Sequence, residues 1–214
     1  MDTKTQTRKA TRREREYLRK RQEIMSAART LFIAKGLRNT TLDEIAEASA
    51  FAKGTIYNYF TNKDDLFLAI IQQLIDETST ATRAAINEAA EGTRAKFFAY
   101  ALASVSQFHT NSEVFLMVMR EHNQLDPKMI ARFIDGFQEK LSLISEPLQA
   151  DRSSGSIQSS DPQKLAVLFD GMIRTYCLMT SHELWPGNGQ SPADVAELMV
   201  SVFFDGIESK QFQG

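Results

Sequence analysis

Apolar residues recur at the helical period along nearly the whole chain, and this pattern constrains the fold more than any other feature. A clear example is the row at positions i, i+4, i+7 and i+8 formed by Ile24, Ala28, Leu31 and Phe32. Residues at this spacing lie on one face of a helix. No segment shows a convincing alternation of apolar and polar residues, which a half-buried strand would need. The sequence therefore predicts an all-α fold.

Start and stop signals divide the chain into separate helices. Gly36 ends the first helix, and Thr41 with Glu44 forms a capping box that opens a short second helix. Thr61 or Asn62 caps the fourth, and Pro162 and Pro192 each follow a capping residue at the first helical position. The later helices are expected at residues 53–60, 66–90, 94–110, 112–122, 127–148, 162–183 and 192–208.

Charge is distributed unevenly along the chain. Residues 1–64 carry 14 basic and 8 acidic side chains, a net charge of +6, whereas residues 65–214 carry 11 and 19, a net charge of −8. A basic end favours contact with a polyanion, although a solvated charged face is the simpler alternative. A single Cys177 cannot form an intrachain disulfide, and no apolar run approaches the length of a membrane span. We therefore expect a cytoplasmic protein without a membrane partner.

Two short helices joined by a tight turn within residues 42–60 predict a helix-turn-helix. Ile56 and Phe60 are four positions apart and are expected to face the core, while Lys53 and Tyr57 share another face. The functional interpretation is a recognition helix in the major groove of DNA, with phosphate contacts at both ends. The alternative is that these polar side chains only cover a helical bundle.

Residues 40–71, TTLDEIAEASAFAKGTIYNYFTNKDDLFLAII, carry a more specific pattern than a generic helix-turn-helix. Over residues 22–71 the chain resembles the DNA-binding domain of TetR-family transcriptional regulators. The resemblance implies a set of DNA-contacting residues: Thr41, Lys53, Gly54, Thr55, Tyr57, Asn58, Tyr59 and Lys63.

The turn departs from the family pattern. Ala50-Phe51-Ala52 stands where family members usually carry Gly-Val-Ser. If the turn needs a positive φ at Ala50, the strain costs about 1 kcal/mol. Ala52 also lacks the hydroxyl that would cap the recognition helix, worth roughly 0.5–2 kcal/mol.

The resemblance also implies the domain organisation. We expect a basic N-terminal arm with the start of the first helix at 1–21, the helix-turn-helix DNA-binding domain at 22–65, and a larger helical effector-binding and dimerisation domain at 66–214. The arm has few apolar residues and cannot fold alone. It either lies along phosphates or in a minor groove, or is a solubilising tail.

Aromatic and methionine residues are dense between positions 97 and 137. Most would belong to a helical core, but the family usually hollows this region into an effector pocket. A small apolar or amphipathic effector is expected there, and Glu113 and Glu121 would favour a cationic ligand if they faced it. The candidate effector-binding residues are Phe97, Tyr100, Phe108, Phe115, Met119, Phe133, Phe137 and Tyr176.

Other chemistry has weaker support. His109 with Glu113, and Glu121 with His122, would form a metal site only if further ligands converged, so neither metal nor cofactor is expected. Cys177 and His182 lack the spacing of a nucleophile and its base, and we expect no enzyme.

The last two helices carry apolar rows, including Phe169, Leu198 and Phe203, which are rich enough to bury one face internally and another against a second copy. A homodimer built through them would bind a near-palindromic operator in double-stranded DNA. We therefore expect a sequence-specific transcriptional regulator, a repressor whose DNA affinity is changed by its effector. The alternatives are a nonspecific architectural DNA-binding protein or, less in keeping with the sequence, a helical enzyme.

Overall fold

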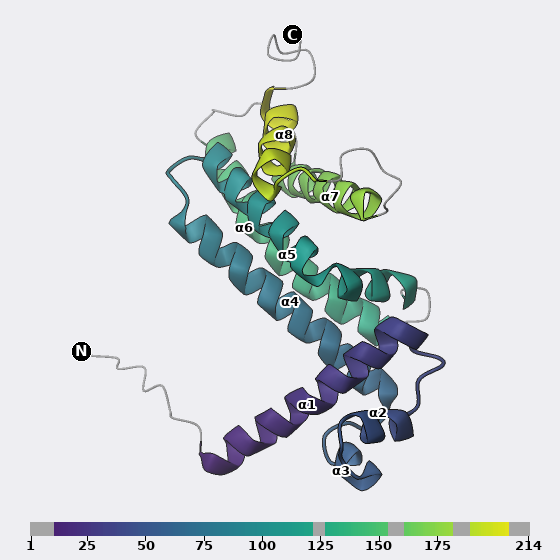
Figure 1. Cartoon of the computed structure of the whole chain (residues 1–214). Helices are drawn as coiled ribbons and strands as arrows, with labels where there is room; N and C mark the ends of the chain where they lie inside the picture. The colour runs from purple at the N-terminus through teal and green to yellow at the C-terminus, as the bar shows by residue number, and fades with distance from the viewer. Residues whose placement is uncertain (1–10, 122–126, 154–160, 182–188, 206–214) are drawn as a thin grey trace, which may run out of the picture. The chain divides into compact units, whose positions relative to one another are not determined.

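The computed structural model describes residues 11–121, 127–153, 161–181 and 189–205, apart from the side chains at 128, 129, 132, 133 and 152. These residues form helices and connecting turns without a strand, as Figure 1 shows, so the all-α prediction is confirmed. The helices are α1 (Arg12–Lys35), α2 (Leu42–Ala48), α3 (Lys53–Tyr57), α4 (Lys63–Glu88), α5 (Thr93–Glu121), α6 (Pro127–Ser153), α7 (Pro162–Thr180) and α8 (Pro192–Asp205).

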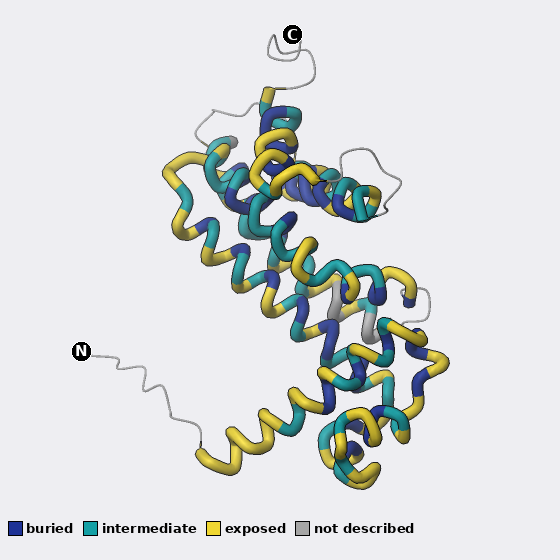
Figure 2. The backbone as a smooth tube through the Cα atoms, viewed as in Figure 1, coloured by how far each residue is buried: buried dark blue, intermediate teal, exposed yellow. Residues whose placement is uncertain are grey.

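The chain divides by packing into two compact units, Met1–Ile70 and Ile71–Gly214. The division falls within α4, whose first turns belong to the first unit and whose remainder belongs to the second. Each unit has its own buried residues, visible as the dark-blue inner faces of the helices in Figure 2.

The first unit packs α1, α2, α3 and the start of α4 around a small apolar core. Ile24 and Phe32 of α1 are fully buried, and the Phe32 ring meets the Phe67 ring edge to face at 5.6 Å. Ile56 and Phe60 are 0% and 2% exposed, so the prediction that they face the core is confirmed. Burial of these side chains fixes the angle between α2 and α3.

Helix α1 begins at Arg12, within the 1–21 segment that was expected to hold the basic arm and the start of the first helix. Thr11 and Glu14 form a reciprocal capping box, in which the Thr11 hydroxyl accepts from the Glu14 N–H and the Glu14 carboxylate accepts from the Thr11 N–H. This box lies in the stretch that was assigned to the basic arm, and it starts the helix at Arg12. Of the predicted arm, residues 1–10 lie outside the described part of the chain.

Most of the predicted boundary residues act as caps. Gly36 ends α1 with a φ of 81°, and Asn62, the second of the two candidates, accepts from the Asp65 N–H at 2.8 Å. Helix α4 starts at Lys63, directly after the predicted cap and before the 66 given for its approximate span. Asp161 caps α7 through the Gln163 N–H, and Ser191 caps α8 through the Asp194 N–H.

The second unit is built around α5, which packs along α8 and contacts α6 and α7. Phe97 and Tyr100 of α5 are fully buried beside Phe169 of α7. Two helices were expected at 94–110 and 112–122, and the break between them is confirmed: α5 is interrupted at Asn111, where φ is −120° and ψ is 22°. Helix α6 continues through Pro147 to Ser153, beyond its predicted end at 148.

Candidate nucleic-acid interface and effector cavity

The turn between α2 and α3 is tight and partly strained. The Phe51 N–H donates to the Ala46 carbonyl at 3.0 Å, and the Ala50 N–H to the Glu47 carbonyl at 3.1 Å. Ala50 has a φ of +56°, which confirms the expected left-handed conformation of an alanine where a glycine would be relaxed. Ala52 occupies the N-cap of α3 without a side-chain hydrogen bond, so this helix begins uncapped.

One side of α3 has no role in the core. Lys53, Gly54, Tyr57 and Asn58 are all exposed, and Tyr57 exposes 51% of its surface. A Cβ atom placed on Gly54 would meet nothing within 4 Å, and Gly54 has no positive φ. The fold therefore does not require glycine at this position, although glycine weakens a helix by about 1 kcal/mol relative to alanine.

Lys53 is held by an exposed ion pair across the helix-turn-helix. Its Nζ lies 2.7 Å from an oxygen of Asp43 on α2, and both side chains are more than half exposed. The hydrogen bond with Asp43 raises the pKa of Lys53, so the ammonium is charged at neutral pH. An exposed pair of this kind is weak in water, and its lysine can exchange the carboxylate for a phosphate.

Three other candidate DNA contacts contribute to local structure. Thr41 caps α2, and its hydroxyl accepts from the Glu44 N–H. Tyr59 is half-buried, and its ring stacks on Tyr17 of α1 with centroids 4.7 Å apart. Thr55 is half-buried, and its carbonyl accepts from the Asn58 N–H.

Lys63 has a structural role that the sequence did not reveal. Its ammonium group donates to the carbonyl oxygens of Leu37, Arg38 and Thr40 at 2.8, 3.1 and 3.4 Å. These carbonyls lie in the connection between α1 and α2, where no helical N–H is available to them. Lys63 was predicted to bind a phosphate, and this geometry instead directs its three donors into the protein.

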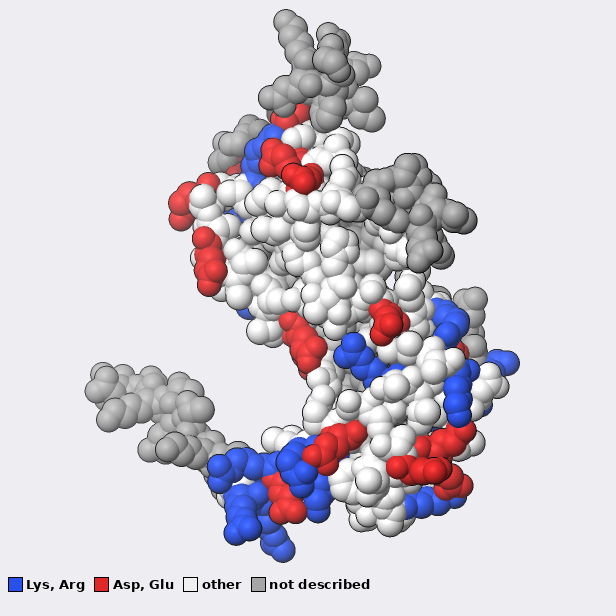
Figure 3. All heavy atoms as spheres, viewed as in Figure 1, with Lys and Arg blue, Asp and Glu red and all other residues white. Residues whose placement is uncertain are grey.

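The first turns of α1 form a basic surface. Residues 11–19 are all exposed, and Lys and Arg side chains gather over this end of the helix in Figure 3. Arg19 pairs with Glu23 and Lys20 with Glu16, so part of the charge is balanced along the helix. Part of the sequence first interpreted as an arm is therefore a rigid helical surface.

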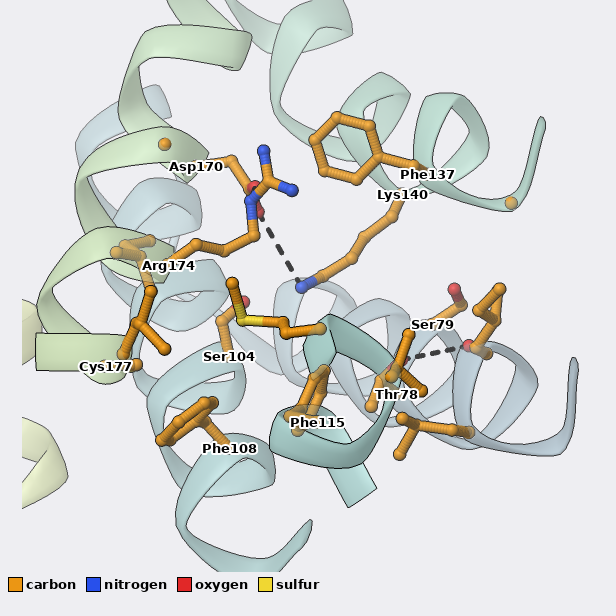
Figure 4. A pocket seen from close by; sticks show the side chains of 18 of the residues that line it. Thr78, Ser79, Ser104, Phe108, Phe115, Phe137, Lys140, Asp170, Arg174 and Cys177 are labelled. Atoms are coloured by element: carbon orange, nitrogen blue, oxygen red, sulfur yellow. Dashed lines mark hydrogen bonds and ion pairs between the residues drawn. The ribbon is translucent and has the colours of Figure 1, made fainter. Parts of the chain in front are cut away.

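The second unit contains a cavity of about 450 Å³ lined by α4, α5, α6 and α7, shown in Figure 4. This volume falls within the usual range for small-molecule sites, roughly 300–1,000 Å³. Gly136 lines the cavity on α6, and a Cβ atom there would lie 2.6 Å from Ile75 Cγ2 of α4. Glycine at this position lets the two helices approach closely.

Four of the predicted effector residues line this cavity: Phe108, Phe115, Met119 and Phe137. The rings of Phe108 and Phe115 stack with centroids 5.4 Å apart, one on each side of the interruption at Asn111. The side chain of Phe133 lies outside the described part of the structure.

Three predicted effector residues lie elsewhere. Phe97 is packed into an aromatic cluster with Phe169 and Phe203, with ring centroids 4.7 and 5.4 Å away. Tyr100 is buried behind the cavity wall, and the Tyr176 hydroxyl donates to the side chain of Gln190. Helical spacing groups such residues by face, but it does not tell whether a face meets a hollow or another helix.

A charged cluster at the cavity was missed from the sequence. Asp170 of α7 is 1% exposed, and its Oδ1 accepts a hydrogen bond of 2.6 Å from the Tyr100 hydroxyl. Arg174 Nε lies 2.7 Å from the other carboxylate oxygen, and Lys140 Nζ of α6 lies 3.9 Å from Oδ1. Asp170 and Arg174 are four positions apart on α7, but Lys140 and Tyr100 are 30 and 70 positions from Asp170, so only the packed structure brings the three helices' side chains together.

The surroundings change how these groups titrate. Burial lowers the pKa of Lys140, against the opposing effect of the Asp170 carboxylate. Burial also raises the pKa of Tyr100 well above its ordinary value, and the nearby Asp170 charge acts in the same direction. Cys177 lines the cavity, and burial raises the pKa of its thiol to about 12.

The acidic residues considered for a cationic ligand do not line this cavity. Glu113 is exposed, and Glu121 is buried with an oxygen 3.1 Å from Arg120 Nε. Within the described ranges, no three His, Cys, Asp or Glu side chains are grouped as a metal ion would require. None of the described helices combines the length and apolar character needed to cross a membrane.

Comparisons with known proteins identify the first unit. The family model described as "Bacterial regulatory proteins, tetR family" matches residues 24–70. The HTH-type transcriptional regulator YhgD of Bacillus subtilis (strain 168) is 26% identical over 157 residues, covering 72% of this chain and 78% of YhgD. The HTH-type transcriptional repressor KstR2 of Rhodococcus jostii (strain RHA1) is 24% identical over 191 residues, covering 89% of this chain and 92% of KstR2.

The fold similarity extends over both units. The crystal structure of AibR in complex with isovaleryl coenzyme A and operator DNA matches with a TM-score of 0.67 at 20% identity, covering 86% of this chain and 97% of AibR. The matched family model, the relatives and the fold lead to the same conclusion. The chain is a DNA-binding transcriptional regulator, and its residues 24–70 form a DNA-binding domain of the TetR family.

Proposed function

We propose that the chain is a homodimeric repressor, acting in the cytoplasm, that reads a near-palindromic operator with α3 and changes its DNA affinity when a small apolar or amphipathic ligand fills the cavity. The observation that carries the proposal is the exposed side of α3. Four of its residues contribute nothing to the core, and one is a glycine that the fold does not require. Such a surface is selected by an external partner rather than by folding.

The chemistry of this surface favours double-stranded DNA. Lys53 supplies a charge for phosphate, and Gly54 allows a close backbone approach. Tyr57 and Asn58 supply hydrogen-bonding groups that reach base edges or phosphates. The basic first turns of α1 supply further charge for the DNA backbone. Thr41, Thr55 and Tyr59 then support the reading surface, and Lys63 holds the α1–α2 connection beside it.

The dimer interface is proposed on α7 and α8. Leu168 exposes 62% of its surface, Val167 43% and Leu198 37%, so these apolar side chains of α7 and α8 have surface that a second copy could cover. Phe203 was expected to contribute here, but it packs internally against Phe97 and Phe169. Two-fold pairing through the exposed residues would present two recognition helices, about 34–36 Å apart or a multiple of this distance, to a symmetric operator.

Selection of bound sequences from random double-stranded DNA, carried out with the intact chain at two salt concentrations, tests the proposal. A near-palindromic consensus is expected, and Asn58→Ala should weaken consensus binding more than binding to random DNA. Asn111→Ala, outside the first unit, is the matched control. Recovery of unrelated sequences with a steep salt dependence would instead support a nonspecific architectural protein.

A further inference from the structure

The cavity wall carries a largely buried ammonium group, that of Lys140, for which none of the described residues supplies a hydrogen-bond acceptor. Lys140 leaves only 17% of its side chain exposed and extends from α6 toward the middle of the cavity, as Figure 4 shows. Its nearest carboxylate oxygen, Asp170 Oδ1, is 3.9 Å away, too far for a hydrogen bond. Its other close neighbour is the Tyr100 ring, with the centroid 4.9 Å away. A buried charge with this little compensation is costly.

Asp170 is already engaged by other groups. Its Oδ1 accepts from the Tyr100 hydroxyl at 2.6 Å, and its Oδ2 lies 2.7 Å from Arg174 Nε. The Oδ2 contact is an ion pair without good hydrogen-bond geometry. One carboxylate therefore faces two cations, Lys140 and Arg174, and the wall of the cavity keeps one excess positive charge.

A second polar group in the wall lacks a partner. Ser104 lies on α5, is 8% exposed and lines the cavity, and its hydroxyl has no hydrogen-bond partner among the described residues. Buried hydroxyls are nearly always hydrogen-bonded in folded proteins, so this unpaired hydroxyl could donate a hydrogen bond to a ligand in the cavity. Thr78 differs, because its hydroxyl donates to the Ile75 carbonyl at 3.0 Å.

The remaining wall is mainly apolar, with Phe108, Phe115 and Phe137 among its largest side chains. We infer that the cavity binds an amphipathic monoanion, whose carboxylate is held by Lys140 and Ser104 and whose hydrocarbon body packs against these rings. This inference rests on the proposed ligand-binding function and specifies the class of ligand. One excess positive charge fits a single carboxylate, and it disfavours cations and neutral molecules of the same size.

Calorimetry with three probes of matched length tests the inference on the intact chain: decanoate, decan-1-ol and decyltrimethylammonium. Decanoate is expected to bind about ten- to a hundredfold more tightly than decan-1-ol, the range for a charge-assisted hydrogen bond. Octanoate should bind about fourfold more weakly for each methylene removed. Equal affinity of the acid and the alcohol, preference for the cation, or no binding by any probe would each overturn the inference.

Lys140→Met removes the charge and keeps the side-chain length. It should abolish the preference for decanoate while leaving decan-1-ol affinity within about threefold of the parent, and Lys96→Met, which does not line the cavity, should keep the preference. Ser104→Ala should reduce decanoate affinity by about fivefold and serves as a second variant with little risk to folding. Retention of the preference in Lys140→Met would exclude Lys140 as the anion-binding residue.

The same probes separate the two levels of the proposal. Fluorescence anisotropy of labelled operator is measured with each probe present. If decan-1-ol binds as well as decanoate and both release the operator, the anion inference fails and the regulatory function stands. If decanoate binds preferentially and leaves operator affinity unchanged, the anion inference stands and ligand regulation fails.

Discussion

Lys63 and Leu37 are 26 positions apart, yet the Lys63 ammonium donates a 2.8 Å hydrogen bond to the Leu37 carbonyl oxygen. Two further carbonyls of the same connection, those of Arg38 and Thr40, accept from the same group. The first turn of α4 is thereby hydrogen-bonded to the connection between α1 and α2.

Lys63→Ala should reduce the free energy of unfolding by about 1.5–3 kcal/mol, the usual loss for hydrogen bonds to a charged group. Denaturant unfolding followed by circular dichroism measures this. Lys35→Ala, which loses only an exposed ion pair with Glu44, is the control and should have a much smaller effect. If Lys63→Ala leaves the stability unchanged and weakens DNA binding, Lys63 is a phosphate contact, as the sequence predicted.

Ala50→Gly should stabilise the protein. Relief of the positive φ is worth about 1–2 kcal/mol, and the greater freedom of glycine in the unfolded chain offsets about half of it. We therefore expect a gain of roughly 0.5–1 kcal/mol in thermal or denaturant unfolding. Ala48→Gly, two residues earlier and still in α2, should destabilise by about 1 kcal/mol. If both variants lose stability, the left-handed conformation of Ala50 is not the source of strain.

Gly54→Ala should separate folding from DNA binding. The added methyl group meets nothing within the protein and favours the helix, so stability should be unchanged or rise by about 0.5–1 kcal/mol. Operator affinity should fall about tenfold or more, because the methyl group occupies space needed by DNA. Gly171→Ala on α7, which is equally unobstructed, should leave operator affinity unchanged. Operator binding by Gly54→Ala at parental affinity would show that α3 does not approach DNA closely.

Leu168→Glu should convert the dimer to monomer, because it places a charge in the apolar interface proposed on α7 and α8. Sedimentation velocity across a concentration series measures the change, and operator binding should be lost with it. Gln163→Glu, on the same helix, changes charge outside the apolar surface and should leave the dimer intact. If the parent protein sediments as a monomer at all concentrations, both the proposed interface and the proposed palindromic operator are wrong.

Cys177 should be inert in the folded protein. Burial raises the pKa of its thiol from 9.0 to about 12, so the thiolate fraction at pH 8 is roughly a thousandfold below that of an unperturbed cysteine. Alkylation by iodoacetamide, followed by mass spectrometry, should therefore be very slow until the chain unfolds. Urea-unfolded protein, which should react like a free thiol, is the reference. Rapid labelling of the folded protein would show that the cavity opens to solvent at Cys177.

The regular part of the fold could be predicted because it depends on local signals. The spacing of Ile56 and Phe60 placed both in the core, and a helix break was expected between 110 and 112, where Asn111 leaves the helical conformation. The capping box at Thr11 is an equally local signal, but it lies in a highly charged stretch, and that stretch was interpreted as an arm.

The cavity chemistry could not be predicted in the same way. Lys140, Asp170 and Tyr100 belong to three helices, and no periodicity within one helix brings them together. Phe97 and Phe108 are both aromatic residues of α5, yet one is buried among rings and the other lines the cavity. The difference depends on which neighbouring helix covers each residue.

Along α5, which is interrupted at Asn111, residues of the core and residues of the cavity wall lie at different positions. Phe97 and Tyr100, before it, are completely buried, so change there would disturb the core of the unit. Phe115 and Met119, after it, lie on the cavity wall, and Met119 exposes 51% of its surface. Substitutions at Phe115 or Met119 would therefore reshape the cavity wall while leaving the buried Phe97 and Tyr100 in place.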